Sequence, residues 1–268
     1  MKSVRLSAIA FLLVIAALSL LAERIAPPGY AAQHRDAINE DPSLQYPLGT
    51  DELGRDSLAR LLAGLRLSIL LACASAAFCC LIATVLGVVS GLIGGCLESL
   101  VLGCIGLVES IPWIFLFLTV RALLPLNVGP AASIWITFAL LALLGWTHAA
   151  RVVQSAAAGL RNSGAILYAR ACGIHGWRLW LLQTLPGLRS VCLTQFMLLV
   201  PGFILAEAGL GLLGLGVSEP LPSMGNLLRH LENQELVRAH PVVLVPLVVL
   251  VAVMLGFRVV CGGPELTS

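Results

Sequence analysis

The chain has 268 residues, of which 59% are hydrophobic and 11% are charged, and its formal net charge is +2. This composition excludes a single soluble globular domain, because one core cannot bury so much apolar surface. Apolar runs of about 20 residues recur, which is the length that crosses a bilayer. The sequence therefore predicts an all-α fold, a polytopic membrane helical bundle with about six transmembrane helices.

The first predicted span, about Leu6–Leu21, follows the basic residues Lys2 and Arg5. A basic start before an apolar run is also typical of a signal peptide, but a retained membrane anchor is favoured. Five more spans are predicted at about Leu67–Ile93, Leu100–Val120, Ala131–Thr147, Val191–Leu215 and Pro241–Phe257. The second span of the chain has a glycine-rich exit at Gly94 and Gly95, and the third is broken by Pro112.

The polar segment before the second span alternates turn-forming residues with acidic ones. Its candidate functional residues are Gly49, Thr50, Asp51, Gly54, Arg55 and Asp56. The carboxylates could ligate a cation, but a capped, turn-rich approach to the next span is favoured. Thr50 or Asp51 would then cap a helix that begins near Glu52.

The segment 151–189 has five arginines and no acidic residue. Loops rich in arginine stay on the cytoplasmic side of a membrane, so this loop is predicted to lie inside. With Lys2 and Arg5 also inside, both termini are predicted to be cytoplasmic. The chain then divides into an N-terminal anchor with an external segment (1–66), a core (67–260) and a short cytoplasmic tail (261–268).

Within this loop, a helix through Ile166–Cys172 is predicted to end at Gly173, since glycine accepts the backbone turn that other residues resist. A second helix would carry Ile174, Trp177 and Leu181 on one face. Tryptophan and arginine are common anchors at protein contacts, which favours a docking surface. An interfacial aromatic belt, with the arginines on anionic lipid, fits the same residues.

Ionisable residues inside a span usually serve a function, and Glu109 and Glu207 are the candidates. Glu207 precedes a glycine-rich run and is better explained by a helix break or a polar cavity than by ion coupling. Lys2 is the only lysine, so the chain lacks the P-loop lysine that reaches the phosphates of ATP. No catalytic set and no metal-ligand spacing is present, so neither a catalytic nor a metal site is predicted.

Three blocks of sequence carry a family resemblance. They are Tyr46–Asp56, then Ala169–Gly173 with Leu185 and Pro186, and finally Glu207–Ala208 with Leu213–Val217 and Pro222–Asn226. On these blocks the chain resembles the C-type membrane permease subunit of ABC importers of the dipeptide/oligopeptide/nickel class. The middle block resembles the coupling loop known as the EAA motif, although Leu167 stands where the family usually has glutamate and Tyr168 where it has alanine.

The resemblance implies a type I ABC importer permease fold in a bacterial cytoplasmic (inner) membrane. It implies translocation of di- or oligopeptides, or of a related small solute such as nickel chelates, by a subunit that is not itself an enzyme. The chain would bind no cofactor, while ATP and Mg would be bound by partner subunits. Implied partners are a second, B-type permease, two ATP-binding subunits and an extracytoplasmic solute-binding protein, beside membrane lipid and without nucleic acid.

The resemblance also implies roles for residues. The ATPase-coupling loop would comprise Leu167, Tyr168, Ala169, Arg170, Ala171, Gly173, Ile174, Trp177, Arg178, Leu185 and Pro186. The translocation path or its gate would include Glu207, Gly209, Gly214 and Gly216, and the external segment would contact the binding protein. The alternative function is an ion-gradient-driven secondary transporter or channel without an ATPase, for which Glu109 or Glu207 would be essential.

Overall fold

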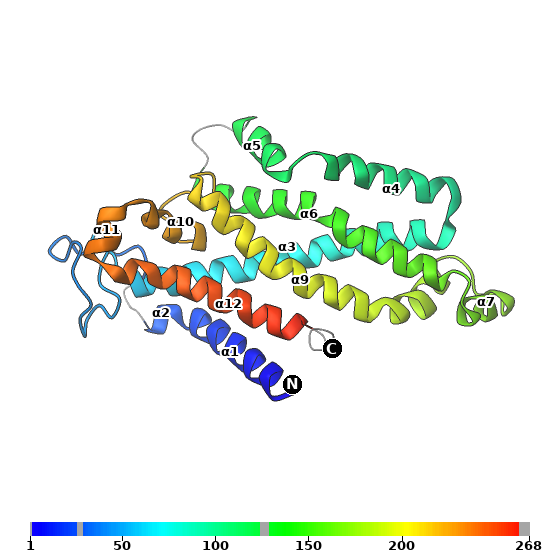
Figure 1. The fold of residues 1–268 in the computed structure, drawn as a ribbon, viewed down its shortest axis with the longest axis horizontal. Helices are drawn as coiled ribbons and strands as arrows, with labels where there is room; N and C mark the ends of the chain where they lie inside the picture. The colour runs from blue at the N-terminus through cyan, green and yellow to red at the C-terminus, as the bar shows by residue number, and fades with distance from the viewer. Residues whose placement is uncertain (1, 26–28, 124–128, 263–268) are drawn as a thin grey trace. The chain divides into compact units, whose positions relative to one another are not determined.

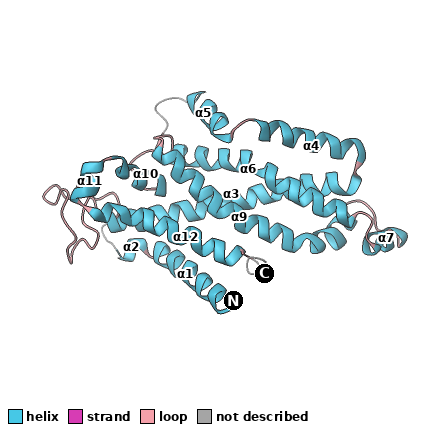
Figure 2. Cartoon of the chain, viewed as in Figure 1, coloured by secondary structure: helices cyan, strands magenta, loops and turns pink. Residues whose placement is uncertain are grey.

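The computed structural model describes residues 2–25, 29–123 and 129–262, and most of the chain within these ranges is helical (Figure 1). The described residues contain no β-strand, and an isolated antiparallel bridge joins Thr50 and Asp56 (Figure 2). The predicted tail 261–268 lies outside the described residues beyond Gly262.

The long helices are α1 (Lys2–Leu20), α3 (Ser57–Ile93), α4 (Gly95–Ser110), α5 (Trp113–Leu123), α6 (Pro130–Leu160), α9 (Leu185–Leu212) and α12 (Val245–Cys261). The short helices are α2 (Ala22–Ile25), α7 (Gly164–Ala171), α8 (Trp177–Leu179), α10 (Met224–Arg229) and α11 (Gln234–Ala239). A π-helical turn, η1 (Trp180–Thr184), precedes α9, and 3-10 turns η2 (His230–Glu232) and η3 (Pro241–Leu244) flank α11.

The chain forms two compact units. The first comprises Met1–Cys73, Pro125–Phe138 and Val200–Ser268, and the second comprises Ala74–Leu124 and Ala139–Leu199. Helices α3, α6 and α9 therefore contribute residues to both units. The external segment, α1 and α10 to α12 belong to the first unit, whereas α4, α5, α7 and α8 belong to the second.

Five of the described helices are long and apolar enough to cross a membrane. A sixth crossing is formed if α4 and α5, which meet at an angle of 77°, count as one broken span. These six segments coincide with the six predicted spans, which confirms the all-α polytopic fold. Pro112, which lies in the break between α4 and α5, accounts for the interruption because proline cannot donate a helical hydrogen bond.

The predicted boundaries need correction at two helices. Helix α3 begins at Ser57 rather than Leu67, because Asp56 caps it: Asp56 Oδ1 accepts hydrogen bonds from the backbone N–H groups of Leu58 (2.8 Å) and Ala59 (3.3 Å). Helix α6 continues beyond Thr147 to Leu160. Periodicity of apolar residues locates the middle of a span, but it does not show at which residue the helix begins or ends.

In the first unit, α1 and α12 pack antiparallel. A Cβ atom on Gly256 would lie 3.0 Å from the Leu12 side chain, so the glycine lets α12 approach α1 closely. At the other end of the pair, Arg5 Nη2 donates a hydrogen bond to the carbonyl oxygen of Gly262 (2.6 Å). The N-terminal helix is thus fixed to the last helix of the same unit.

In the second unit, α3 and α6 meet along a seam of small residues. A Cβ atom on Gly87 would lie 2.9 Å from the carbonyl oxygen of Ala150, and one on Gly91 would lie 2.6 Å from Cβ of Ala157. Two glycines four residues apart let helix backbones approach closely, which is how helices associate where lipid removes the hydrophobic driving force.

We predict that Gly91→Val destabilises the protein by about 1–3 kcal/mol, because the added side chain overpacks the seam against Ala157. The melting temperature of the detergent-purified protein should fall. Gly103→Ala on α4 is the control, since nothing lies within 4 Å of its Cβ position, and it should leave stability unchanged or slightly raised. An unchanged melting temperature for Gly91→Val would contradict a close seam.

Candidate functional site

Helix α7 and the turn after it form an elbow in the acid-free loop. The Ser163 side chain caps α7 by accepting a hydrogen bond from the backbone N–H of Ile166. At the other end, Gly173 has φ of +80°, and the N–H of Ile174 donates to the carbonyl oxygen of Ala169 (2.9 Å). This pattern ends a helix with a left-handed glycine, so the helix ends where the sequence predicts.

The elbow has a small core of its own. Ile166 and Ala169 of α7 and Leu179 of α8 are buried together, and Ile174 packs against them. A core that fixes α7 against α8 makes the elbow a firm unit rather than slack chain. Leu185, at the start of α9, is half-buried, and Pro186 follows it directly after the π-helical turn.

Three large side chains of the elbow point away from this core. Leu167 is 52% exposed, Tyr168 is 74% exposed and Trp177 is 66% exposed. The guanidinium of Arg178 lies 5.7 Å from the centre of the Trp177 ring, which is within range of a cation–π contact. The elbow therefore presents an apolar and aromatic surface with a positive rim.

The predicted common face of Ile174, Trp177 and Leu181 is wrong in part. Ile174 packs inward while Trp177 points outward, because Gly176, with φ of +59°, turns the backbone between them. The side chain of Leu181 lies outside the described residues. The sequence shows the helix end at Gly173, but the spacing of apolar residues could not reveal this second turn.

Beside the elbow is a hollow of about 590 Å³. Arg170, His175, Trp177 and Trp180 line it from the loop, and Val89, Leu92 and Ile93 line it from the end of α3. Its lining combines cationic and aromatic groups with an apolar wall.

Arg161 connects the start of the loop to α3 and α4, and its place in the sequence does not indicate this role. Arg161 Nε donates to the carbonyl oxygen of Gly91 (2.8 Å), and its Nη2 pairs with Glu98 Oε2 (2.9 Å). Gln154 Nε2 donates to the other oxygen of Glu98 (2.7 Å). These bonds join the end of α6 to the turn between α3 and α4. Glu98 is the acid nearest the glycine-rich exit of the second span, but nothing in the sequence pairs it with Arg161.

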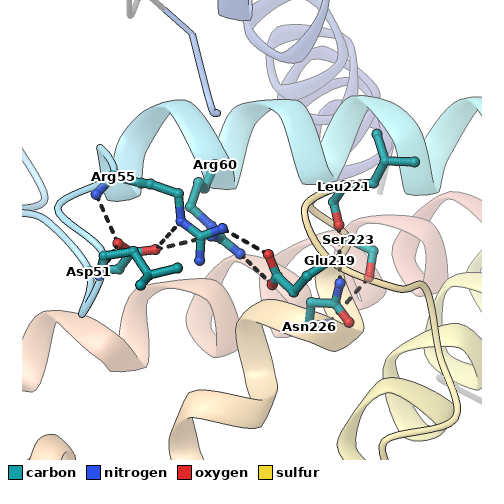
Figure 3. A network of polar contacts seen from close by, with 8 residues as sticks. Asp51, Arg55, Arg60, Glu219, Leu221, Ser223 and Asn226 are labelled. Atoms are coloured by element: carbon teal, nitrogen blue, oxygen red, sulfur yellow. Dashed lines mark hydrogen bonds and ion pairs between the residues drawn. The ribbon is translucent and has the colours of Figure 1, made fainter. Parts of the chain in front are cut away.

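The first unit carries a second polar site, in which two arginines hold two carboxylates (Figure 3). Asp51 Oδ2 lies 2.7 Å from Arg55 Nε and 3.0 Å from Arg60 Nη1. Glu219 Oε2 lies 2.8 Å from Arg55 Nη1, and its Oε1 lies 2.8 Å from Arg60 Nη2. The network links the external segment and the start of α3 to the segment that follows α9.

The network shifts the pKa values of Glu219 and Arg55. Burial raises the pKa of the Glu219 carboxyl. The charges and hydrogen bonds of Arg60 and Arg55 lower it by more than burial raises it, so the pKa lies below the usual range. Burial lowers the pKa of Arg55, and Asp51 and Glu219 more than offset this, so its pKa is raised. Burial and the charge of Arg60 lower the pKa of His230.

The predicted cap at Thr50 or Asp51 is wrong. Asp51 Oδ1 accepts from the backbone N–H groups of Leu53 (2.9 Å) and Arg55 (2.8 Å), which closes a turn rather than a helix. Thr50 Oγ1 accepts from the N–H of Glu40 (2.9 Å) and donates to the carbonyl oxygen of Ala37. The residue that caps α3 is Asp56. In the sequence alone, Asp56 and Asp51 are equally good candidates for a helix cap.

Two glycines of the external segment are required by its backbone. Gly49 and Gly54 have φ of +67° and +69°, and a Cβ atom on either would collide with a carbonyl oxygen, that of Glu40 or of His34. Across residues 2–25, 29–123 and 129–262, no group of three or more His, Cys, Asp or Glu side chains is placed to hold a metal ion.

Glu207 lies fully buried in α9, against α10. Its Oε2 accepts from Ser68 Oγ (3.1 Å), and its Oε1 accepts from the N–H of Gly225 (3.3 Å). Ser68 Oγ in turn accepts from the N–H of Met224 (3.3 Å). The carboxyl therefore serves groups at the start of α10. It lies within α9 and is fully buried, so the expected helix break or polar cavity beside it is not what the structure shows.

The glycines near Glu207 have different surroundings. A Cβ atom on Gly211 would lie 2.2 Å from Cα of Gly225, and one on Gly216 would lie 2.7 Å from Cα of Gly211. Gly214 has φ of +71° after the end of α9, whereas Gly209 has nothing within 4 Å of its Cβ position. Gly211 is thus the close helix contact, and the sequence prediction for the path or gate omitted it.

Comparison with known proteins gives a consistent result. A family model described as "Binding-protein-dependent transport system inner membrane component" matches residues 83–260. The dipeptide transport system permease protein DppC of Haemophilus influenzae is 28% identical over 259 residues, which is 94% of this chain and 85% of that protein. The oligopeptide transport system permease protein OppC of the same organism is 29% identical over 81% of this chain and 70% of its own length. DppC of Bacillus subtilis is 30% identical over 80% of this chain and 65% of its own length.

We predict that Glu219→Gln lowers the melting temperature at neutral pH, because both arginines lose a charged partner. Glu219 is half exposed, so the loss should be roughly 1 kcal/mol. A carboxyl whose pKa is lowered on folding stabilises the protein above its unfolded pKa and loses this effect as the pH falls toward the folded pKa. The difference between wild type and variant should therefore shrink below about pH 4.5, the ordinary pKa of the group.

Glu235→Gln, at an exposed position of α11, is the matched control and should show no such difference. Thermal unfolding of the purified protein from pH 3.5 to pH 7 would measure both variants. Equal melting temperatures of wild type and Glu219→Gln at neutral pH would contradict a stabilising network.

Proposed function

The chain belongs to the family of binding-protein-dependent transport system inner membrane components, and from this membership we propose that it is the permease subunit of an ATP-driven importer of di- or oligopeptides. Its relatives are named as dipeptide and oligopeptide permeases, which supports peptides over nickel chelates as the solute. The chain passes the inner membrane several times and provides part of the path.

The subunit works with partners that supply energy and solute. Two ATP-binding subunits bind and hydrolyse ATP with Mg, a second, B-type permease completes the path, and an extracytoplasmic solute-binding protein delivers the peptide. The absence of any lysine beyond Lys2 supports this division of labour, because a P-loop lysine must then come from another chain. The part of the acid-free loop that follows α6 lies in the cytoplasm, as do both termini.

The exposed surface of the elbow is the observation that carries this proposal. Leu167, Tyr168 and Trp177 project from an element whose own core holds it firm. Exposed apolar and aromatic side chains with an adjacent arginine are typical of protein contacts. We assign this surface to a cleft in an ATP-binding subunit. The alternative, an interfacial belt on lipid, requires no firm elbow.

Movement of the elbow reaches the membrane helices through its base. When the ATP-binding subunits close, they displace α7, and Arg161 carries this displacement to Gly91 of α3 and Glu98 of α4. Because α3 and α6 are closely packed along the glycine seam, they move together. The path then opens outward, receives a peptide, and returns to its inward-open state after hydrolysis.

The rival function, a secondary transporter or channel driven by an ion gradient, needs an acidic residue with access to ions. The carboxyl of Glu207 is buried and hydrogen-bonded to Ser68 and Gly225, which argues against such a role for Glu207, and the carboxyl of Glu109 is paired with Arg151. A purified chain that moved peptide along a gradient without ATP would support the rival. Peptide uptake that requires all the partners and ATP supports the importer.

We predict that Trp177→Glu weakens binding of the ATP-binding subunits by at least about 30-fold, the effect of removing a central contact residue. Peptide uptake and peptide-stimulated ATP hydrolysis by the reconstituted transporter should fall with it. Asn162→Ala, an exposed change in the turn before α7, is the control and should leave both activities intact. Normal uptake with Trp177→Glu would remove the elbow from the mechanism.

A further inference from the structure

Three ionisable side chains of the second unit form a cluster that the coupling mechanism does not use. Arg151 Nη2 donates a hydrogen bond to Glu109 Oε2, and His148 Nδ1 lies 3.3 Å from Glu109 Oε1. Glu109 ends the apolar run of α4, while His148 and Arg151 lie three residues apart on α6 and so share one side of that helix. Glu109 therefore has two partners, which its isolation in the sequence concealed.

The cluster is exposed on this chain. The side chain of Glu109 is 25% exposed, that of Arg151 is 48% exposed and that of His148 is 89% exposed. The three ionisable side chains are therefore not paired because this chain buries them.

The cluster lies at the depth of the bilayer if α6 is centred in the membrane. Helix α6 has 31 residues and contains a stretch that is long and apolar enough to span a membrane. At 1.5 Å per residue it is about 46 Å long, and Arg151 and His148 lie about 14 and 18 Å from its end at Leu160. A hydrocarbon core about 30 Å thick, centred on this helix, contains both residues. Exposed charge at that depth is costly against lipid, so this face must meet water or protein.

The backbone gives a second, independent reason. Helix α4 ends at Ser110, immediately after Glu109, and α5 begins at Trp113 at an angle of 77°. Ser110 and Ile111 at the break are exposed. Lipid cannot satisfy the backbone groups that a break releases, and a non-helical segment at membrane depth is tolerated where it is buried in protein or lines a water-filled cavity. Side chains and backbone therefore exclude lipid from the same place.

We propose that Glu109, His148 and Arg151 line the water-filled path of the solute. This inference rests on the proposed function, since it needs a path that opens and closes. The cluster joins one carboxylate to one guanidinium and one imidazole, so it offers both signs of charge. Such a wall suits a zwitterionic solute, a class that includes peptides with free termini.

Cysteine accessibility tests the placement in the complete transporter in membrane vesicles. A charged, membrane-impermeant methanethiosulfonate is added from the cytoplasmic side, and mass spectrometry reads each site separately from the native cysteines. His148→Cys should react in the nucleotide-free complex and at least about tenfold more slowly when a non-hydrolysable ATP analogue holds the inward-facing path shut.

Two control positions bracket the result. Leu143→Cys is 57% exposed on α6 but lies about 140° around the helix from His148, on a side that carries apolar residues, and should stay unreactive. Asn162→Cys, in the turn after α6, should react with and without the analogue. If His148→Cys behaves like Leu143→Cys, the cluster does not face water, and if it behaves like Asn162→Cys, it lies outside the path. Either outcome overturns the proposal.

Charge selectivity provides a second test. Glu109→Lys makes the wall wholly cationic, so uptake of dilysine should fall at least about threefold more than uptake of diglutamate. Glu109→Gln should shift the ratio in the same direction by less. An equal fall for both dipeptides would contradict a path-lining position. Failure of the wild-type transporter to import either dipeptide with ATP would count against the proposed function, whereas the labelling pattern does not depend on the solute.

Discussion

A bilayer offers no water to charges or to free backbone groups, so each polar group at membrane depth needs a partner or a wet cavity. The described chain follows this constraint in three ways. Glu207 is enclosed by Ser68 and the start of α10. Arg161 and Glu98 pair near the ends of their helices. Glu109, Arg151 and His148 pair with one another yet stay exposed, and this difference separates a structural polar contact from a candidate wall of the path.

The same constraint explains how the helices are held together. Lipid is as apolar as leucine, so close packing must replace the hydrophobic effect between helices. The seam at Gly87 and Gly91 provides that packing in the second unit, and Gly256 provides it in the first. Arginine pairs add fixed points where helices end, at Arg161 and at Arg60. Stiff helices with fixed ends can transmit a movement that begins at the elbow.

The architecture could be predicted because it depends on local patterns. Long apolar runs located six spans, Pro112 marked the break in the third, and Gly173 marked the end of α7. The pairings could not be predicted, since Arg60 and Glu219 are far apart in sequence, as are Glu98 and Arg161. The cap of α3 was misplaced because Asp51 and Asp56 carry the same local signal, and only the fold decides between them.

The elbow separates the residues that make its fold from those that face outward. Ile166, Ala169 and Leu179 form its core, while the side chain of Leu167 contributes to none of that packing. Substitutions at residue 167 can therefore accumulate without unfolding the loop. In lineages where this surface meets another subunit, drift at residue 167 would be matched by drift in the opposing cleft. Permeases with leucine and with glutamate at this position would then become poor substitutes for each other in hybrid transporters.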